Sequence, residues 1–300
     1  MSVVGIDLGG TKIAAGVFRG GEIASRVTVP TPEEGGEAVV AAMAHAARAA
    51  AEAAGVEITA IGLGTPGPLN YKTGVIKFAP NIAGFTNFPI RPLLEAATGR
   101  PVYIENDANA AALAEHKLGA GRGSDSTLFV TVSTGVGGGF VLGDKVLRGA
   151  NGQGAEVGHI TVQAGGPMCG CGLDGCLEAI ATGPAMERMA LAAFQREMGT
   201  RELFALFQQG DPRASRIMLQ GAHWLGVGLA SLAKCFDPDV IVVGGGVALN
   251  AGQPYLDEIH DTYARYMTGW IAPPIQMAKL GGEAGLLGAA LTAALEVGEA

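Results

Sequence analysis

The sequence has few charged and few aromatic residues. Charged residues make up 16% of the 300 positions and aromatic residues 6%. The balance of 20 Lys and Arg against 28 Asp and Glu leaves a net charge of −8. No basic patch is available to neutralise phosphates along a nucleic acid, so we expect no nucleic-acid partner.

Long apolar runs, an apparent leader and a disulfide framework are missing as well. No window reaches about 18 consecutive residues of the Leu, Ile and Val kind, which a membrane-spanning helix needs. The first ten residues, MSVVGIDLGG, carry no positive region of the kind that opens a signal peptide. Four cysteines in 300 residues do not indicate a disulfide scaffold. We expect a soluble cytoplasmic protein with no membrane partner.

Glycine is abundant. There are 48 glycines in 300 residues, whereas an average chain has about 7%. The glycines follow no triplet period and the hydrophobic share is 48%, so collagen and a disordered chain are both excluded. The surplus indicates many tight turns, or backbone that closely approaches a ligand. The length predicts about two domains.

The chain is predicted to open with a strand, a turn and another strand, which differs from the strand–turn–helix start of a dinucleotide-binding fold. The segment IDLGGTKIAAGVF and the later segment VSTGVGGGFVLG share this pattern. They lie about 125 residues apart, as expected for a duplicated sheet unit in two domains with a cleft between them.

The remaining elements follow from hydrophobic periodicity and from helix-ending glycines. Strands are predicted at residues 3–7, 13–18, 22–29, 58–63, 102–105, 127–132, 140–142 and 240–243. Helices are predicted at residues 36–55, 107–117, 183–198, 212–236, 253–269 and 284–295. We expect a smaller domain over 1–118, a larger one over 119–283, and a C-terminal segment, 284–300, that packs back on the first.

The usual nucleotide motifs give no support for a P-loop or Rossmann protein. The pattern G-x-x-x-x-G-K-[ST] does not occur. The pattern G-x-G-x-x-G occurs at 62–67 and at 170–175, but at this glycine content about one match arises by chance. The first match also contains Pro66, followed by Pro68, where a helix would have to begin.

The two Gly/Thr turns are better candidates for phosphate binding. Successive backbone N–H groups in such a turn form a concave anion site, and glycine lets phosphate oxygens come close. The candidate contacts are Gly9, Gly10, Thr11, Lys12, Thr134 and Gly135. Asp7, at the end of the first strand, is placed to hold Mg²⁺ through water, as that ion keeps part of its hydration shell. Each loop alone could be an ordinary hairpin turn, but the pair together with Asp7 favours phosphate binding.

A third glycine cluster, Gly244, Gly245 and Gly246, follows the strand predicted at 240–243. Backbone without side chains permits close packing of a flat ring such as adenine. A tight strand-to-helix turn explains this cluster equally well.

The segment YIENDANAAALAEHKLG brings Asn106 and Asp107 to the start of an Ala-rich helix. Asp107 could simply cap that helix. A helix N-terminus also favours an ionised carboxylate, which suits a general base that accepts the proton of a sugar hydroxyl. The surrounding motifs favour the catalytic role.

Three cysteines and a histidine show the spacing of a metal site. His159, Cys169, Cys171 and Cys176 follow the pattern H-x9-C-x-C-x4-C. Thiolates and an imidazole suit tetrahedral Zn²⁺, and four protein ligands leave no open position, so the zinc is expected to be structural. Reduced thiols without metal are the alternative. Cys235 is expected in the core.

Two acids adjoin the cysteine loop. Glu156 precedes His159 by three residues, and Glu178 follows Cys176 by two. Carboxylates and an imidazole gathered in a cleft can hydrogen-bond several sugar hydroxyls. The alternative is that both are ordinary solvated acids on the surface. This alternative is less favoured here because the chain has few charged residues.

Together these residues resemble the ROK family of repressors and sugar kinases, and within it the bacterial ATP-dependent glucokinases. GIDLGGTK, ENDANAA, STGVGGG and GAEVGH…CGCGLDGCLE stand in the family's order over nearly the whole chain. The resemblance implies an α/β fold of the actin-like ATPase type, with duplicated ribonuclease-H-like sheets in two domains and an active-site cleft. It also implies ATP, Mg²⁺ and structural Zn²⁺ as cofactors, and a homodimer or homotetramer.

The resemblance further assigns roles to individual residues. Asp107 matches the catalytic base, and His159 would bind both zinc and sugar. Positions that match sugar contacts are Gly67, Asn81, Asn106, Glu156, His159 and Glu178. Positions that match the phosphate loops are Gly9, Gly10, Thr11, Lys12, Thr134 and Gly135, and Gly244 to Gly246 match the adenosine region.

The expected reaction is transfer of the γ-phosphoryl group of Mg·ATP to the 6-hydroxyl of glucose, with Asp107 as general base. Kinases for fructose, mannose, N-acetylmannosamine or N-acetylglucosamine share these motifs and remain alternatives. A sugar-responsive repressor would need a winged helix ahead of the strand that starts at Val3. A purely structural protein held together by zinc is a further alternative, but it does not explain the phosphate loops or Asp107.

Overall fold

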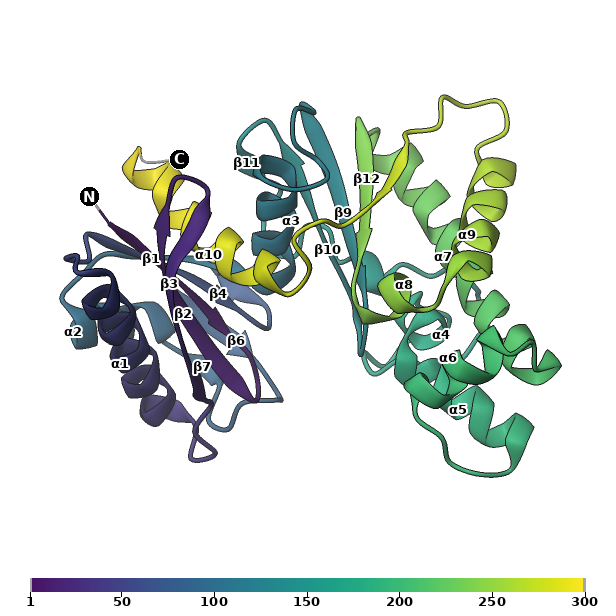
Figure 1. The fold of residues 1–300 in the computed structure, drawn as a ribbon, viewed down its shortest axis with the longest axis horizontal. Coiled ribbons are helices and arrows are strands. Elements are labelled where there is room, and N and C mark those ends of the chain that lie inside the picture. The colour runs from purple at the N-terminus through teal and green to yellow at the C-terminus, as the bar shows by residue number, and fades with distance from the viewer. Residues whose placement is uncertain (1, 299–300) are drawn as a thin grey trace. The chain divides into compact units, whose positions relative to one another are not determined.

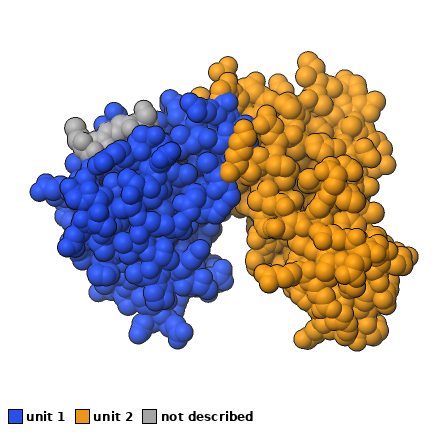
Figure 2. Space-filling view, viewed as in Figure 1, with its two compact units in different colours: residues 1–122, 144–155, 280–300 blue, residues 123–143, 156–279 orange. Residues whose placement is uncertain are grey.

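A computed structural model describes residues 2–298, which form two compact units. Of these, unit 1 contains residues 2–122, 144–155 and 280–298, and unit 2 contains residues 123–143 and 156–279 (Figure 2). The sequence predicted one domain boundary at residue 118. It did not predict that residues 144–155 return to unit 1. Contacts that are distant in sequence, which composition does not reveal, place this segment there.

Unit 1 is built on a five-stranded sheet with the order β3–β2–β1–β4–β8 (Figure 1). Its strands are β1 Val3–Leu8, β2 Lys12–Arg19, β3 Glu22–Pro30, β4 Ala60–Thr65 and β8 Val102–Asn106. β1 pairs antiparallel with β2 and parallel with β4, and β4 pairs parallel with β8. The predicted strand–turn–strand opening is confirmed.

Helices cover both faces of this sheet because the side chains of β1 alternate in direction. The two covering helices are α1 Gly36–Ala54 and α10 Ala284–Val297. Every second residue from Val4 to Leu8 joins the core beneath α1. On the other face, a Cβ at Gly5 would lie 2.6 Å from the carbonyl oxygen of Leu286, so α10 packs directly on strand backbone. Asp7 lies on this α10 face.

Smaller elements complete unit 1. They are β5 Leu69–Asn70, β6 Val75–Phe78 and β7 Thr86–Phe88, which form a three-stranded sheet, with α2 Ile90–Thr98, α3 Asp107–Lys117, β11 Lys145–Val146 and the 3₁₀ helix η2 Gly281–Glu283. Helix α3 has the predicted bounds. The small sheet and α2 were not predicted, since strands of two to four residues are too short to show alternation.

Unit 2 repeats the central strand order of unit 1. Its four strands are β9 Ser126–Val132, β10 Val136–Leu142, β12 Val240–Gly244 and β13 Ile275–Met277, in the order β10–β9–β12–β13. β9 pairs antiparallel with β10 and parallel with β12, as β1 pairs with β2 and β4. The predicted duplication of the sheet unit is confirmed.

Helices make up most of the rest of unit 2. They are the 3₁₀ helix η1 Val157–His159, α4 Glu178–Ala181, α5 Gly183–Phe194, α6 Thr200–Gln208, α7 Pro212–Phe236, α8 Gly246–Asn250 and α9 Gln253–Tyr266. The helix predicted to reach residue 198 ends earlier because Gln195 takes a left-handed conformation, φ 56°. Helices α6 and α8 and strand β13 were not predicted. Over residues 2–298, no helix is both long and apolar enough to cross a bilayer.

Candidate active site

In unit 1 the candidate residues gather at the carboxyl ends of three parallel strands. In the register of the sheet, Asp7 of β1 pairs with Gly64 of β4, and Thr65 of β4 pairs with Asn106 of β8. The carboxyl edge of a parallel sheet is where open α/β proteins bind ligands. The topology therefore brings Asp7 and the Asn106–Asp107 corner to one edge, although about a hundred residues separate them.

Asp7 is partly buried on the α10 face. Burial raises its pKa above the ordinary value, and the positive charges of Lys12 and Arg26 offset part of that effect. A Cβ at Gly285, in the first turn of α10, would lie 3.0 Å from Oδ2 of Asp7. A carboxylate in this position can hold a hydrated cation next to the first glycine turn.

The first glycine turn lies against Asn81, one of the predicted sugar contacts. The turn closes with a hydrogen bond from the Gly9 N–H to the Lys12 carbonyl, at 3.0 Å. A Cβ at Gly10 would lie 3.2 Å from both Cβ and the carbonyl oxygen of Asn81. Gly67 has φ +88°, and any side chain there would collide with the carbonyl oxygen of Phe78. Only glycine fits at that position.

Asn106 caps helix α3, which corrects the alternative that Asp107 is the cap. Oδ1 of Asn106 accepts hydrogen bonds from the N–H groups of Ala108, at 3.0 Å, and Asn109, at 3.2 Å. Asn106 is extended, with φ −64° and ψ 146°, whereas Asp107 is already helical. Asp107 is exposed and accepts from the Ala108 N–H through Oδ1 at 2.7 Å. Its carboxylate is thus presented to solvent at a helix N-terminus, which favours the ionised form.

In unit 2 the second and third glycine clusters lie side by side. The register pairs Gly244 of β12 with Thr131 of β9. Gly245 has φ +90°, and a side chain there would collide with the carbonyl oxygen of Val132. Ser133 and Thr134 follow directly in the chain, so the two loops meet at one edge of the sheet.

These two loops border a cavity of about 690 Å³ within unit 2. Its walls include Ser133, Thr134, Gly183, Phe204, Gly246 and Asn250. Glu187 also lines the cavity, where its Oε1 accepts from both the N–H and the hydroxyl of Thr200 at 2.6 Å. A cavity of this size, with polar groups and one aromatic ring, can hold a nucleoside. Glu187, Thr200 and Phe204 were missed in the sequence because no motif marks them.

Glu178 joins the second glycine turn to the cysteine loop. Its Oε2 accepts a hydrogen bond from the Val136 N–H at 3.1 Å and would lie 2.8 Å from a Cβ at Gly135. Its Oε1 lies 3.8 Å from Sγ of Cys169. Glu178 is therefore held by backbone and cysteine loop together, which excludes the alternative of a freely solvated surface acid. Glu156 precedes η1 and is exposed.

The four predicted metal ligands converge. One side-chain donor atom from each of His159, Cys169, Cys171 and Cys176 lies within 4.8 Å of all the others. Nδ1 of His159 is the ring atom near Cys169, at 3.7 Å from its Sγ. Burial, together with the neighbouring cysteines, raises the pKa of Cys176 to about 12. A bound cation would favour the thiolate form, and three sulfurs with one imidazole nitrogen are a donor set that fits Zn²⁺.

Cys235 was expected in the core, and this expectation is wrong. The residue is exposed near the end of helix α7. The apolar stretch around it is one face of an amphipathic helix, and position 235 falls outside that face.

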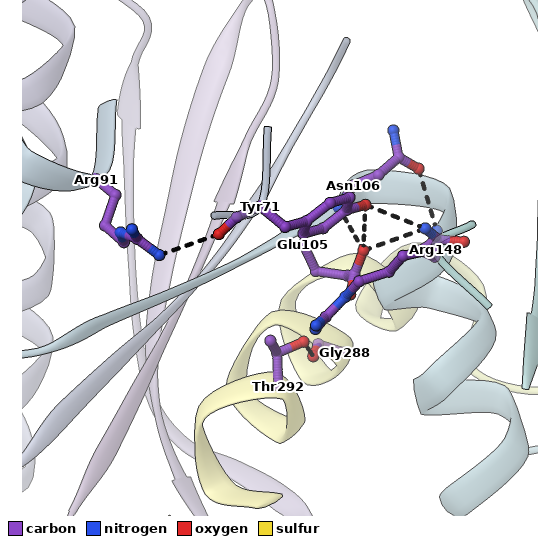
Figure 3. Close-up of polar contacts among 8 residues, drawn as sticks. Tyr71, Arg91, Glu105, Asn106, Arg148, Gly288 and Thr292 are labelled. Atoms are coloured by element: carbon purple, nitrogen blue, oxygen red, sulfur yellow. Dashed lines mark hydrogen bonds and ion pairs between the residues drawn. The ribbon is translucent and has the colours of Figure 1, made fainter. Parts of the chain in front are cut away.

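A buried network behind the Asn106–Asp107 corner was also missed. Glu105 is fully buried and accepts hydrogen bonds from Tyr71 and Arg148 (Figure 3). The sequence does place Glu105 next to Asn106, but it gives no sign that Tyr71 and Arg148 reach it. Those contacts span 34 and 43 residues of chain.

Known proteins of similar sequence and structure cover the whole chain. The model of the ROK family matches residues 3–295. A glucokinase from Streptomyces coelicolor is 42% identical over 311 residues, and the alignment covers 96% of each chain. The crystal structure of a ROK hexokinase from Thermus thermophilus is similar with 63% identity and a TM-score of 0.95 over 100% of both chains. A ROK family glucokinase from Streptomyces griseus, in complex with glucose and AMPPNP, is similar with 39% identity and a TM-score of 0.82, covering 98% of this chain and 100% of that one.

Proposed function

Because this chain belongs to the ROK family, we propose that it is an ATP-dependent hexose kinase that phosphorylates glucose on its 6-hydroxyl. Two proteins similar over nearly their full length are glucokinases, and one of them was solved with glucose and an ATP analogue. The duplicated actin-like ATPase fold and the nucleoside-sized cavity of unit 2 support the same activity.

The observation that carries the mechanism is the position of Asp107. Its carboxylate is exposed at the first turn of α3, and Asn106 is the residue that caps the helix. Asp107 can therefore accept the proton of the sugar hydroxyl while that oxygen attacks the γ-phosphorus in line. Asn106 retains its side-chain amide N–H₂ for a sugar hydroxyl, since its cap uses only Oδ1.

The proposed sugar contacts are the positions that match the family's sugar contacts. We assign hydrogen bonds to its hydroxyls to Glu156, to Glu178 and to Nε2 of His159, the ring nitrogen opposite the one that faces Cys169. Gly67 and Asn81 are assigned further sugar contacts. Fixing the sugar in one orientation converts the attack into an effectively unimolecular step. This positioning supplies a large part of the rate enhancement over the reaction in solution.

The nucleotide is held by the glycine turns. The N–H groups of Gly9 and Gly10, with Thr11 and Lys12, bind phosphate oxygens from one turn, and Thr134 and Gly135 bind them from the other. Adenosine occupies the cavity beside Gly244 to Gly246. Asp7 would hold Mg²⁺, which when bound neutralises charge on the phosphates. Zinc at the cysteine loop has a structural role only.

Turnover by purified protein tests this function. ADP release is measured with a panel of hexoses, and glucose is expected to give the highest kcat/KM. Asp107→Asn is expected to lower kcat by at least about 10²-fold while glucose still binds. The matched control is Asp261→Asn, an exposed aspartate on α9, which should leave kcat unchanged. Normal turnover by Asp107→Asn would exclude Asp107 as the base.

The subunits are further proposed to associate as a homodimer or homotetramer, as the family resemblance implies. Light scattering coupled to size-exclusion chromatography tests the subunit number, and a monomer at all concentrations would refute this part.

A further inference from the structure

A fully buried carboxylate lies directly behind the proposed catalytic corner. Glu105 is the residue before Asn106 in strand β8, and none of its side-chain surface is exposed to solvent. A buried carboxylate is expensive unless hydrogen bonds and positive charge compensate it. Its position beside Asn106 and Asp107 therefore indicates a role at the proposed catalytic corner.

Four donors converge on this carboxylate (Figure 3). Oε1 accepts from the Tyr71 hydroxyl at 2.7 Å, the Asn106 backbone N–H at 3.0 Å and the Asn109 side-chain amide at 3.1 Å. Oε2 accepts from Nε of Arg148 at 2.8 Å. Asn109 directs its amide N–H₂ at Glu105 although its own buried Oδ1 is left without a hydrogen-bond partner in residues 2–298. The carboxylate thus determines how its neighbours are oriented.

One of these bonds reaches the catalytic corner itself. By accepting from the Asn106 N–H, Glu105 fixes the peptide unit that precedes Asn106. The Asn106 side chain then caps α3, and Asp107 accepts from the next backbone N–H. Side-chain acceptors thereby hold the backbone N–H groups of Asn106, Ala108 and Asn109, on both sides of Asp107. A small rotation of this corner would move the Asp107 carboxylate.

Arg148 extends the network to the segment that leads towards Glu156. It belongs to residues 144–155, the part of unit 1 that both precedes and follows unit 2 residues in the chain. Its guanidinium bonds Glu105 and lies 4.8 Å from the centre of the Tyr71 ring. Arg148 also bonds through its carbonyl to the Gly154 N–H at 3.0 Å. The same carboxylate therefore holds both the Asn106–Asp107 corner and the chain just before Glu156.

We propose that Glu105 is a positioning residue for phosphoryl transfer, which acts through the Asn106–Asp107 corner and through Arg148 to set the turnover number. This inference rests on the proposed role of Asp107. Glu105 touches no substrate, so its effect is expected in kcat, with the KM for ATP unchanged. The nucleotide is bound by other residues.

Glu105→Gln is the main test. The glutamine oxygen still accepts from Asn106, whereas its amide nitrogen faces the Arg148 donor, so the corner loses its second anchor. We expect kcat to fall roughly tenfold or more, because misplacement by a fraction of an ångström is costly in catalysis. The KM for ATP should stay within about twofold of that of the parent. Tyr71→Phe removes a single hydrogen-bond donor to Glu105 and adds no clash. It is expected to lower kcat by a smaller factor than Glu105→Gln does, again with the KM for ATP unchanged.

The matched control is Glu115→Gln. Glu115 is equally buried and lies on α3, where it accepts from the backbone N–H groups of Ala120 and Leu280. This variant should lower Tm and leave kcat unchanged at temperatures well below Tm. A merely structural role for Glu105 would make the two variants alike. Should Glu105→Gln fail to fold, the comparison of Tyr71→Phe with Glu115→Gln carries the test.

The outcomes separate this inference from the proposed function. A folded Glu105→Gln protein with parental kcat, or an equal loss of kcat in Glu115→Gln, would overturn the positioning role. If Asp107→Asn is inactive in the same assays, the proposed base stands and only the role of Glu105 fails. Parental turnover by Asp107→Asn would instead refute the base, and the positioning role with it.

Discussion

At the residue scale, burial of the Asp7 carboxylate lowers the stability of the folded protein. Burial raises its pKa above the ordinary 3.8, and Lys12 and Arg26 offset only part of this. Between the two pKa values the folded protein binds more protons than the unfolded chain, so the free energy of unfolding falls as pH rises above 3.8. At neutral pH the protein is less stable with an ionised Asp7 than with a neutral residue there. A cation bound at this carboxylate would reverse that effect.

Replacing Asp7 with Asn removes the charge and keeps the shape. We expect a higher Tm for the ligand-free protein near pH 7, because no carboxylate has to be desolvated, and a kcat lower by roughly 10²-fold. Calorimetry and the ADP assay measure the two effects. Near pH 4 the gain in Tm should shrink, since Asp7 of the parent then carries its proton for more of the time. A lower Tm for the variant near pH 7 would contradict this account of Asp7.

At the element scale, the cysteine loop connects two segments that carry groups proposed to bind the sugar. It connects η1, which ends at His159, to α4, which begins at Glu178. Two of its four proposed zinc ligands, Cys169 and Cys176, are buried, so these positions anchor the loop. Zinc would hold the ends of these two short helical segments together, and neither segment is long enough to be stable alone.

Cys176→Ser tests this support. We expect loss of bound zinc and a KM for glucose raised by about 10–100-fold, because the groups around the sugar lose their support, with a smaller change in the KM for ATP. Zinc content is measured by mass spectrometry of the purified protein. Cys235→Ser is the control, since this exposed thiol lies outside the cluster, and its zinc content should equal that of the parent. Full zinc content in Cys176→Ser would contradict the assigned ligand set.

Elements with a long periodic pattern and clear ends were predicted from the sequence. Helices α3 and α7 have the predicted bounds, because Asn106 and Asp211 provide N-caps, α3 is rich in alanine, and α7 has an apolar face that repeats over more than three turns. The three-stranded sheet formed by β5, β6 and β7 was not predicted. Its strands are short, and only pairing with one another, together with burial of Leu69 and Ile76, stabilises them.

At the scale of the whole molecule, the C-terminal helix completes the first unit. α10 packs on β1, β4 and α3, and Leu286, Leu287 and Leu291 are buried there. Burying one such leucine contributes about 1.5–3 kcal/mol. Three of them together are comparable to the total stability of a typical domain, about 5–15 kcal/mol. Unit 1 is therefore expected to need residues that follow unit 2 in the chain.

Leu291→Ala tests the contribution of α10. We expect the free energy of unfolding to fall by about 2–5 kcal/mol, because the variant leaves a cavity between the helix and the sheet. Urea denaturation followed by circular dichroism measures it. Glu296→Ala, at an exposed position of the same helix, should change it by less than about 0.5 kcal/mol. Equal effects of the two substitutions would show that α10 does not complete the core.

The sequence by itself determined the duplicated sheet unit, the zinc ligand pattern and the residues proposed for catalysis. Periodicity, spacing and motifs are patterns within short segments of the chain, so they can be recognised without the structure. The tertiary structure decided which residue caps α3, that residues 144–155 return to unit 1, and that Tyr71 and Arg148 reach Glu105. The last two of these depend on contacts between residues far apart in the chain. Such contacts arise only when the sheet brings strand ends together, and no local pattern records them.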